Sequence, residues 1–315
     1  MRSGGPCGRP TLFAAVQELG GGGGRVMRWE VQGTGGLIPC GDVLADGALD
    51  ALPFSVAAVD ENFIVVASTS GVVGIDPVED RVLFSVPKTN LHPNDAFVVD
   101  DPVAGTRLPI IAWSSSGTSS QLRGTIRLLE GYGIDGSVRH SWSGSDLVLG
   151  NATAMSANPN VATEALAMNS AVYTAAEVDL FDAARRRDPA LIGPLSNASV
   201  YTISGGRSLG GTKRLAWSIT IRDEMTGAQQ PGMAISNDPW GTAELAFETI
   251  GSCGEESCEP IHTVLDPTLD QAVFTICEGS PRELLRFDIG GGVCELWADG
   301  SILGNRRLQY LTILP

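Results

Sequence analysis

The clearest hydrophobic pattern in the chain lies near its C-terminus, between Ile261 and Gly300. Four short apolar or alternating runs follow one another there, namely Ile261–Leu265, Ala272–Cys277, Leu284–Ile289 and Val293–Trp297. The turns Asp-Pro, Gly-Ser-Pro, Gly-Gly-Gly and Asp-Gly end them. Short apolar or β-branched runs bounded by Gly, Pro and Asp are typical of strands joined by tight turns. Four such antiparallel strands predict one blade of a β-propeller.

The same unit recurs along the chain. Its best-marked part is the third strand, which ends in a large apolar residue followed by an acid, at intervals of about 50 residues. The marks are Trp29-Glu30, Ile75-Asp76, Leu129-Glu130, Phe181-Asp182, a degenerate copy ending at Asp223, and Phe287-Asp288. Six marks predict six blades.

First and second strands occur at matching positions. The expected first strands are Phe54–Val59, Ala96–Val99, Ala152–Ser156, Ser199–Ile203, Ile261–Leu265 and Leu308–Leu314. The expected second strands are Phe63–Ala67, Pro109–Trp113, Ala165–Met168, Arg214–Ser218 and Ala272–Cys277. We therefore predict an all-β, six-bladed propeller as a single domain over residues 11–315, after a flexible N-terminus of residues 1–10. Within it, residues 237–260 are expected to form a loop insertion that contains an extra strand-like run, Glu244–Ile250.

The two ends of the chain complement each other. Thr11–Val16, Arg25–Val31 and Leu37–Val43 match the second, third and fourth strands of a blade, and Leu308–Leu314 matches the missing first strand. The C-terminal strand is therefore expected to pair with the N-terminal strands and close the ring, which removes two open sheet edges.

One segment allows two interpretations. Val161–Arg187 is rich in Ala and Glu and has the composition of a helix. It also contains the Phe181-Asp182 mark in phase with the other copies, so we assign it to the fourth blade.

Composition limits the partners. Charged residues make up 18% of the chain and the net charge is −15. Nucleic acid and anionic membrane surfaces are therefore unfavourable partners. There is no apolar run of about 18 residues, so no transmembrane segment is expected.

The six cysteines are even in number and form no zinc-type pair. The spacing of Cys253 and Cys258 in CGEESC predicts a loop disulfide, while the pairing of Cys7, Cys40, Cys277 and Cys294 stays open. We therefore favour an exported protein (secreted, periplasmic or on the cell surface) whose signal is not visible in this chain. The alternative is a cytoplasmic protein with free thiols.

The sequence GVVGIDPVEDRVLFSVP, residues 71–87, resembles the repeats of YVTN- and PQQ-type bacterial β-propellers. The resemblance covers most of the chain as a style of repeat and points to no specific family. It implies a binding platform, an assembly scaffold or, more rarely, a hydrolase or lactonase. The fold by itself does not choose among these roles.

Long loops on a rigid ring are where binding residues usually lie. In a propeller the loops from a fourth strand to the next first strand share one face with the loops from second to third strands. We predict that this face binds a protein or another ligand through His92, Asn94, Asp95, Asp146, Trp240, His262 and Arg306. Since His92 and His262 are more simply solvated loop residues, no catalytic residue is assigned; His140 is interpreted as structural.

Catalytic signatures are absent from the sequence: there is no GxSxG elbow, HExxH motif or EF-hand loop. The preferred function is therefore a non-catalytic binding or scaffold propeller with no metal site and no cofactor. The alternative is a metal-dependent hydrolase or lactonase with a divalent cation at the channel. Its oxygen ligands would come from acids at first-to-second strand turns, which are Asp60, Asp100, Asp101 and Asp266. A third possibility is a structural part of a larger envelope protein.

Overall fold

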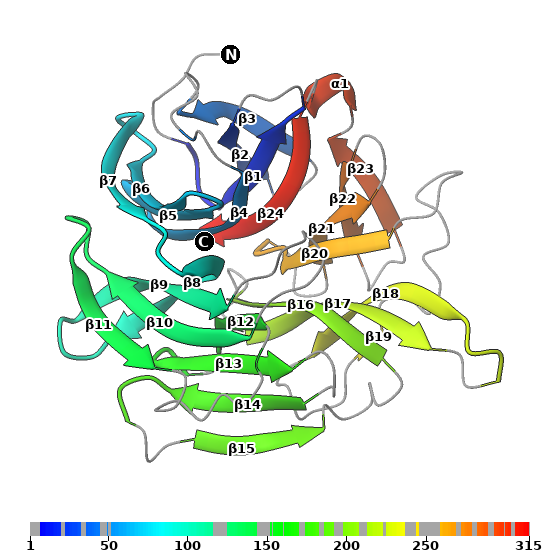
Figure 1. Cartoon of the computed structure of the whole chain (residues 1–315). Coiled ribbons are helices and arrows are strands. Elements are labelled where there is room, and N and C mark those ends of the chain that lie inside the picture. The colour runs from blue at the N-terminus through cyan, green and yellow to red at the C-terminus, as the bar shows by residue number, and fades with distance from the viewer. Residues whose placement is uncertain are drawn as a thin grey trace.

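The computed structural model is shown in Figure 1. It describes residues 7–19, 23–32, 36–44, 49, 52–115, 125–143, 152, 154–159, 161–169, 174–182, 186–191, 198–207, 213–222, 225–236, 244–245, 259–268, 272–278, 282–288, 293–298, 300–303 and 306–314.

Six four-stranded antiparallel sheets surround a common centre and form the blades of a propeller (Figure 1). Blade 1 consists of β24 (Arg306–Leu314), β1 (Thr11–Glu18), β2 (Gly24–Gln32) and β3 (Gly36–Val43). Blade 2 consists of β4 (Pro53–Asp60), β5 (Phe63–Ser68), β6 (Gly71–Asp76) and β7 (Arg81–Pro87). Blade 3 consists of β8 (Leu91–Asp101), β9 (Thr106–Ser115), β10 (Ile126–Tyr132) and β11 (Val138–Ser143). The predicted six-bladed fold is confirmed.

The other three blades follow in chain order. Blade 4 consists of β12 (Ala154–Ala157), β13 (Glu164–Asn169), β14 (Thr174–Asp179) and β15 (Arg186–Leu191). Blade 5 consists of β16 (Ala198–Arg207), β17 (Lys213–Arg222), β18 (Gln229–Ser236) and β19 (Glu244–Leu245). Blade 6 consists of β20 (Glu259–Leu265), β21 (Ala272–Glu278), β22 (Glu283–Asp288) and β23 (Val293–Ala298). The short helix α1 (Gly300–Leu303) leads into β24, and no helix in the described residues is long and apolar enough to cross a membrane.

Blade 1 closes the ring with strands from both ends of the chain. β24 pairs antiparallel with β1, from Thr11 opposite Leu314 to Glu18 opposite Arg306. In Figure 1 the red C-terminal strand lies beside the blue N-terminal one. The predicted closure is therefore confirmed, and it leaves no inner strand of the ring without a neighbouring blade.

The hydrophobic core lies between neighbouring blades. Val65 and Ala67 of blade 2, for example, pack in one buried cluster with Ile111 and Trp113 of blade 3. Similar clusters join blades 1 and 2, 3 and 4, 5 and 6, and 6 and 1. Because both faces of a blade are covered, central strands such as β5 are buried at every position and read as continuous apolar runs.

Three details differ from the sequence prediction. The segment Val161–Arg187, which has the amino-acid composition of a helix, contributes to strands β13, β14 and β15, because burial between blades outweighs the helix propensity of its alanines. The repeat mark at Asp223 was expected at the end of a third strand, but it directly follows β17, which is the second strand of blade 5. The first two strands of this blade are ten residues each, and their length moves the mark out of its expected position in the blade. Glu244–Leu245 pairs with β18 as the fourth strand of blade 5, so it is part of the blade rather than an extra strand.

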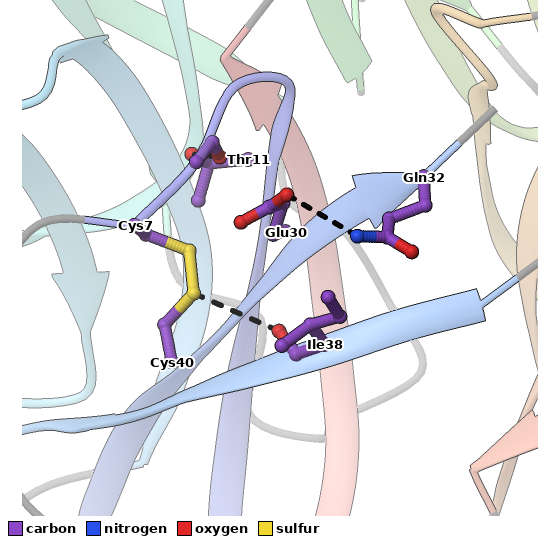
Figure 2. Close-up of a disulfide and its surroundings, with 7 residues drawn as sticks. Cys7, Thr11, Glu30, Gln32, Ile38 and Cys40 are labelled. Atoms are coloured by element: carbon purple, nitrogen blue, oxygen red, sulfur yellow. Dashed lines mark hydrogen bonds between the residues drawn. A yellow bond between two sulfur atoms is a disulfide. The ribbon is translucent and has the colours of Figure 1, made fainter.

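A disulfide joins Cys7 to Cys40 in β3, with 5.6 Å between the two Cα atoms (Figure 2). The Val31 N–H also donates to the Pro10 carbonyl at 2.8 Å. Residues 7–10 are therefore attached to blade 1, while residues 1–6 of the expected flexible N-terminus lie outside the described residues. Cys277 is also disulfide-bonded, while the predicted Cys253–Cys258 pair lies outside the described residues.

We predict that deleting residues 308–315 abolishes cooperative unfolding. The deletion removes the buried side chains of Leu308, Leu311 and Leu314 and exposes the edge of β1. Thermal melting followed by circular dichroism measures this effect. Adding the deleted strand as a synthetic peptide should restore part of the transition, whereas an unchanged melting temperature after deletion would contradict ring closure.

Candidate functional site

The inner strands of all six blades, β24, β4, β8, β12, β16 and β20, surround a cavity of about 120 Å³ at the centre of the ring. Its described lining is Ala57, Ala58, Ala96, Phe97, Val98, Arg107, Ser156, Ala157, Ser204, Gly205, Val264, Leu265, Pro267, Tyr310, Leu311, Thr312 and Ile313. Among these residues Arg107 is the one with a formal charge, and the others are mostly small or apolar. The channel is therefore a narrow, largely neutral space with one cation in its wall.

A repeated hydrogen bond joins the inner strands of neighbouring blades. In each case a side chain of one inner strand accepts the backbone N–H of the next. The bonds are Ala96 N–H to Ser55 Oγ at 2.9 Å, Met155 N–H to Asp95 Oδ2 at 3.0 Å, Gly205 N–H to Ser156 Oγ at 3.1 Å, and Leu311 N–H to His262 Nδ1 at 3.4 Å. We call these four contacts the inner-strand ties. Between blades 5 and 6 the contact is of another kind, because Ser218 Oγ of the second strand β17 lies 2.7 Å from Thr263 Oγ1 of β20.

The ties follow from the place of the inner strands in their sheets. Each inner strand is the last strand of its sheet, so only one of its edges is paired within the blade. A buried N–H on the other edge needs an acceptor, because an unpaired buried donor costs about 1–3 kcal/mol. A side chain of the preceding blade supplies that acceptor and thereby sets how the two blades pack.

Two predicted ligand residues, Asp95 and His262, are members of these ties. Each is 1% exposed, so neither is a solvated loop residue. β8 begins at Leu91, earlier than the expected Ala96, because a bulge between Pro93 and Asp95 allows the strand to continue past the proline. A similar bulge lies between Pro260 and His262, and the His262 ring lies 3.7 Å from the ring of Tyr310.

His92 and Asn94 also lie in β8 and are half-buried. The His92 carbonyl accepts a hydrogen bond from Ser114 Oγ at 3.5 Å. The structure does not bring the two predicted histidines together, because His92 belongs to blade 3 and His262 to blade 6, on opposite sides of the ring. Asp146 and Trp240 lie outside the described residues, as does most of the predicted insertion at 237–260.

Arg306 takes part in an ion-pair network across blade 1. Its guanidinium lies 2.7 Å from Asp42 Oδ2 and 3.4 Å from Glu18 Oε1. Arg25 reaches the same two acids, at 2.5 Å from Glu18 and 3.6 Å from Asp42. Each of the four strands of blade 1 contributes one of these residues, so the network joins both ends of the chain. Its side chains are 9–26% exposed, and this position gives Arg306 a structural role whether or not it also binds a ligand.

Three of the four acids that the hydrolase alternative requires accept hydrogen bonds within the turns. Asp101 Oδ1 accepts the Val103 and Ala104 N–H groups, and Asp266 Oδ1 accepts the Thr268 N–H at 2.8 Å. Asp266 Oδ2 also accepts a hydrogen bond from Arg286 Nε at 2.7 Å.

Asp60 accepts the N–H of Asn62 in the same way, and Asp100 is exposed at the end of β8. None of these four acids is in the described lining of the cavity. In the described residues no three His, Cys, Asp or Glu side chains lie together in a metal-binding group. The hydrolase alternative stays a prediction.

Among the acids of the repeat mark, Asp76 has a similar part in the third-to-fourth strand turn of blade 2. Asp76 Oδ1 accepts the Val78 and Glu79 N–H groups at 3.1 and 3.0 Å, as turn-forming Asp side chains do. In blade 4 this role falls to Asp179 rather than to the marked Asp182. The first-to-second strand turns and the third-to-fourth strand turns lie on the same face of the ring, which we call the turn face. The opposite face is the loop face.

His140 has the structural role that the sequence predicted. Its Nε2 lies 2.7 Å from Asp101 Oδ2, and its ring stacks on Trp142 and meets Phe181 edge-on. Phe181 belongs to blade 4, so this cluster joins blades 3 and 4 at the turn face. Burial by itself would raise the pKa of Asp101, but the Ala104 N–H, His140 and the Val103 N–H outweigh it and hold that pKa below its ordinary value.

The turn face of blades 2 to 4 carries a group of exposed apolar side chains that the sequence prediction missed. We call it the apolar patch; it consists of Val82, Val103, Ile134, Val138 and Val161, which are 41%, 83%, 55%, 47% and 38% exposed. A sequence signal was present. Val103, Ile134 and Val161 lie inside the turn sequences DPVAGT, GIDGS and NPNVAT, where polar residues are usual.

The comparisons with known proteins show the fold. No protein-family model and no curated protein matches the chain. A solved structure of a protein of unknown function from Bacteroides caccae is similar at 10% identity, with a TM-score of 0.55 over 97% of this chain and 98% of that one. A chain in the crystal structure of a nidogen/laminin complex is similar at 10% identity, with a TM-score of 0.59 over 96% and 97% of the two chains.

We predict that Asp95→Ala destabilises the protein by about 1–3 kcal/mol, because the Met155 N–H loses its acceptor in a buried contact. Asp95→Asn keeps a side-chain oxygen and should cost less. Urea unfolding measures the difference. Asp100→Ala is the matched control, since it removes the same charge from an exposed position of the same strand; an equal loss in both alanine variants would contradict the role of the tie.

We also predict that Asp101 contributes to acid sensitivity. Its pKa is lower in the folded state than the ordinary value of 3.8. The stabilisation is therefore present above that value and is lost as the pH falls through the folded-state pKa. Between about pH 5 and pH 2, the unfolding free energy of the wild type should fall more steeply than that of Asp101→Asn. Equal slopes in urea unfolding across this range would contradict the prediction.

Proposed function

We propose that the protein is an exported, non-catalytic binding platform that recognises a protein ligand through the apolar patch on the turn face of blades 2 to 4. The observation that carries the proposal is the concentration of five exposed large apolar residues at the same end of three consecutive blades. Clustered exposed apolar residues are typical of interaction sites, whereas single ones are ordinary.

Contacts between the turns hold the patch together. A Cβ at Gly136, in the turn that carries Ile134, would lie 2.7 Å from Phe84 Cβ in β7, so this turn rests on the strand of blade 2 that also contains Val82. The Asp100 N–H donates to the Ala162 carbonyl at 2.7 Å, which attaches the Val161 turn to blade 3. The patch is therefore built on three blades that are fixed to one another.

Side chains beside the patch supply features that protein interfaces use. Trp142, Phe181 and His140 form a half-buried aromatic cluster that reaches the Val103 turn through Asp101. Aromatic anchors next to exposed apolar residues are common in interface centres. Asp100 and Asp182 are exposed nearby, and the chain carries a net charge of −15. A ligand with apolar side chains flanked by Lys or Arg would complement this surface.

Two further observations support the proposal. The Cys7–Cys40 disulfide favours an oxidising compartment outside the cytoplasm. The similar chain in the nidogen/laminin structure belongs to a complex of two proteins, which is consistent with a binding role for a ring of this shape.

The patch is tested with the triple variant Val103→Ser, Ile134→Ser, Val161→Ser. Loss of three apolar anchors at about 1 kcal/mol each should weaken binding by roughly 100-fold. The wild type and the variant are immobilised and incubated with the secreted proteins of the source organism, and each captured protein is quantified by mass spectrometry. The proposal expects one or more species on the wild type that the triple variant fails to retain.

Met225→Ser is the matched control, because Met225 is 96% exposed but lies in the loop between β17 and β18 on the loop face. It should retain the same species as the wild type. All three substituted patch residues are exposed, so the triple variant should melt within a few degrees of the wild type. A captured set that does not change in the triple variant would refute recognition through this patch.

A further inference from the structure

The central cavity has the features of a small-molecule site that is separate from the apolar patch. Its volume of about 120 Å³ matches the share of about four water molecules in the liquid, so it admits a molecule of a few heavy atoms. Ala57, Ala96 and Ala157 line it from blades 2, 3 and 4, and Val264 and Leu265 from blade 6. These residues carry no formal charge, and Ala57, Ala96, Val264 and Leu265 show only 1–8% of their surface, because their side chains pack mainly between the blades.

Arg107 supplies the one formal charge of the described lining. It lies in β9, the second strand of blade 3, and its Nη1 donates to the Val59 carbonyl of blade 2, which fixes the guanidinium between the two blades. A guanidinium carries five N–H donors, and in the described residues Val59 is the acceptor to which this one is hydrogen-bonded. Donors therefore remain for a ligand at the exposed rim of the cavity.

The charge of Arg107 persists in this position. Arg107 as a whole residue is exposed, but partial burial of its guanidinium lowers its pKa, while Asp100 and Asp60 nearby act in the opposite direction. Arginine starts so far above neutral pH that it stays a cation. Asp100 and Asp60 are themselves exposed to solvent and compete with a bound anion for the guanidinium.

We propose that the central cavity binds a short aliphatic carboxylate, with the carboxylate on the Arg107 guanidinium and the hydrocarbon chain in the uncharged remainder of the cavity. The guanidinium fork matches the two oxygens of a carboxylate, and this pairing is stronger than a neutral hydrogen bond. A phosphate-sized anion lacks a hydrocarbon part to occupy the uncharged remainder of the cavity. A cationic or neutral molecule of the same size would lose the pairing.

Butyrate is the probe, and 1-butanol and butylamine are matched controls of the same chain length. Isothermal titration with the full-length protein should give a dissociation constant on the order of 1 mM for butyrate, since a ligand of six heavy atoms forms few contacts. Butanol and butylamine should bind at least about tenfold more weakly.

Three variants then test the residues. Arg107→Met should weaken butyrate binding at least about tenfold, and Arg107→Lys should retain part of it, because lysine keeps the charge but not the fork. Asp100→Asn should strengthen binding by about two- to threefold, because it removes a competing carboxylate. The strengthening is a change that a merely destabilised protein would not show.

Equal binding of butyrate and butanol would overturn the proposal, and so would butyrate binding that is the same in the wild type and Arg107→Met. A cavity that holds only ordered water at about 50 mM butyrate in a crystal structure, well above the expected dissociation constant, would also overturn it. These outcomes are distinguishable from failure of the protein-binding proposal, because the residues of the apolar patch are not in the described lining of the cavity.

Discussion

The pairing of β24 with β1 is the constraint on which the rest of the molecule depends. A ring of blades buries its core between neighbours, so each blade is stable only when both of its faces are covered. Blade 1 is the one blade built from both ends of the chain, and its four-residue ion-pair network joins all of its strands. The Cys7–Cys40 disulfide adds a covalent link from the start of β1 to the outermost strand of the same blade. Hydrogen bonding, charge and covalent chemistry are therefore concentrated where the ring is joined.

The inner-strand ties solve a second problem of this architecture. Six inner strands converge on the channel, and each has an edge that its own blade leaves unpaired. Ser55, Asp95, Ser156 and His262 accept N–H groups across four of the junctions. Polar residues near the centre of the ring are thus needed for packing. Asp95 and His262 were predicted from the sequence as ligand residues, but in the structure their side chains accept backbone N–H groups of the next blade.

The two faces of the ring differ in how they are constructed. On the turn face, Asp60, Asp76, Asp101, Asp179 and Asp266 accept N–H groups of short turns, which makes this face rigid. Exposed apolar side chains at the tips of such turns do not contribute to the core, so their presence fits selection for contact with another molecule. The channel is a separate feature, since its walls come from the inner strands and its charge from Arg107 of β9. The apolar patch and the described lining of the channel therefore share no residue, although Asp100 lies beside both.

The sequence alone was sufficient for the blade repeat, the number of blades and the closing strand, because these follow from local patterns: apolar runs of strand length, turn residues at their ends, and a regular interval between them. Even Val161–Arg187 was assigned correctly by its phase in the repeat. The site residues could not be obtained in this way. Whether Asp95 faces solvent or an inter-blade contact depends on one bulge after Pro93, and Arg306 meets Asp42 only because the ring closes over 264 residues of chain. Tertiary structure decided these roles, because a side chain's partners across a blade junction are set by packing between segments that are distant in the sequence.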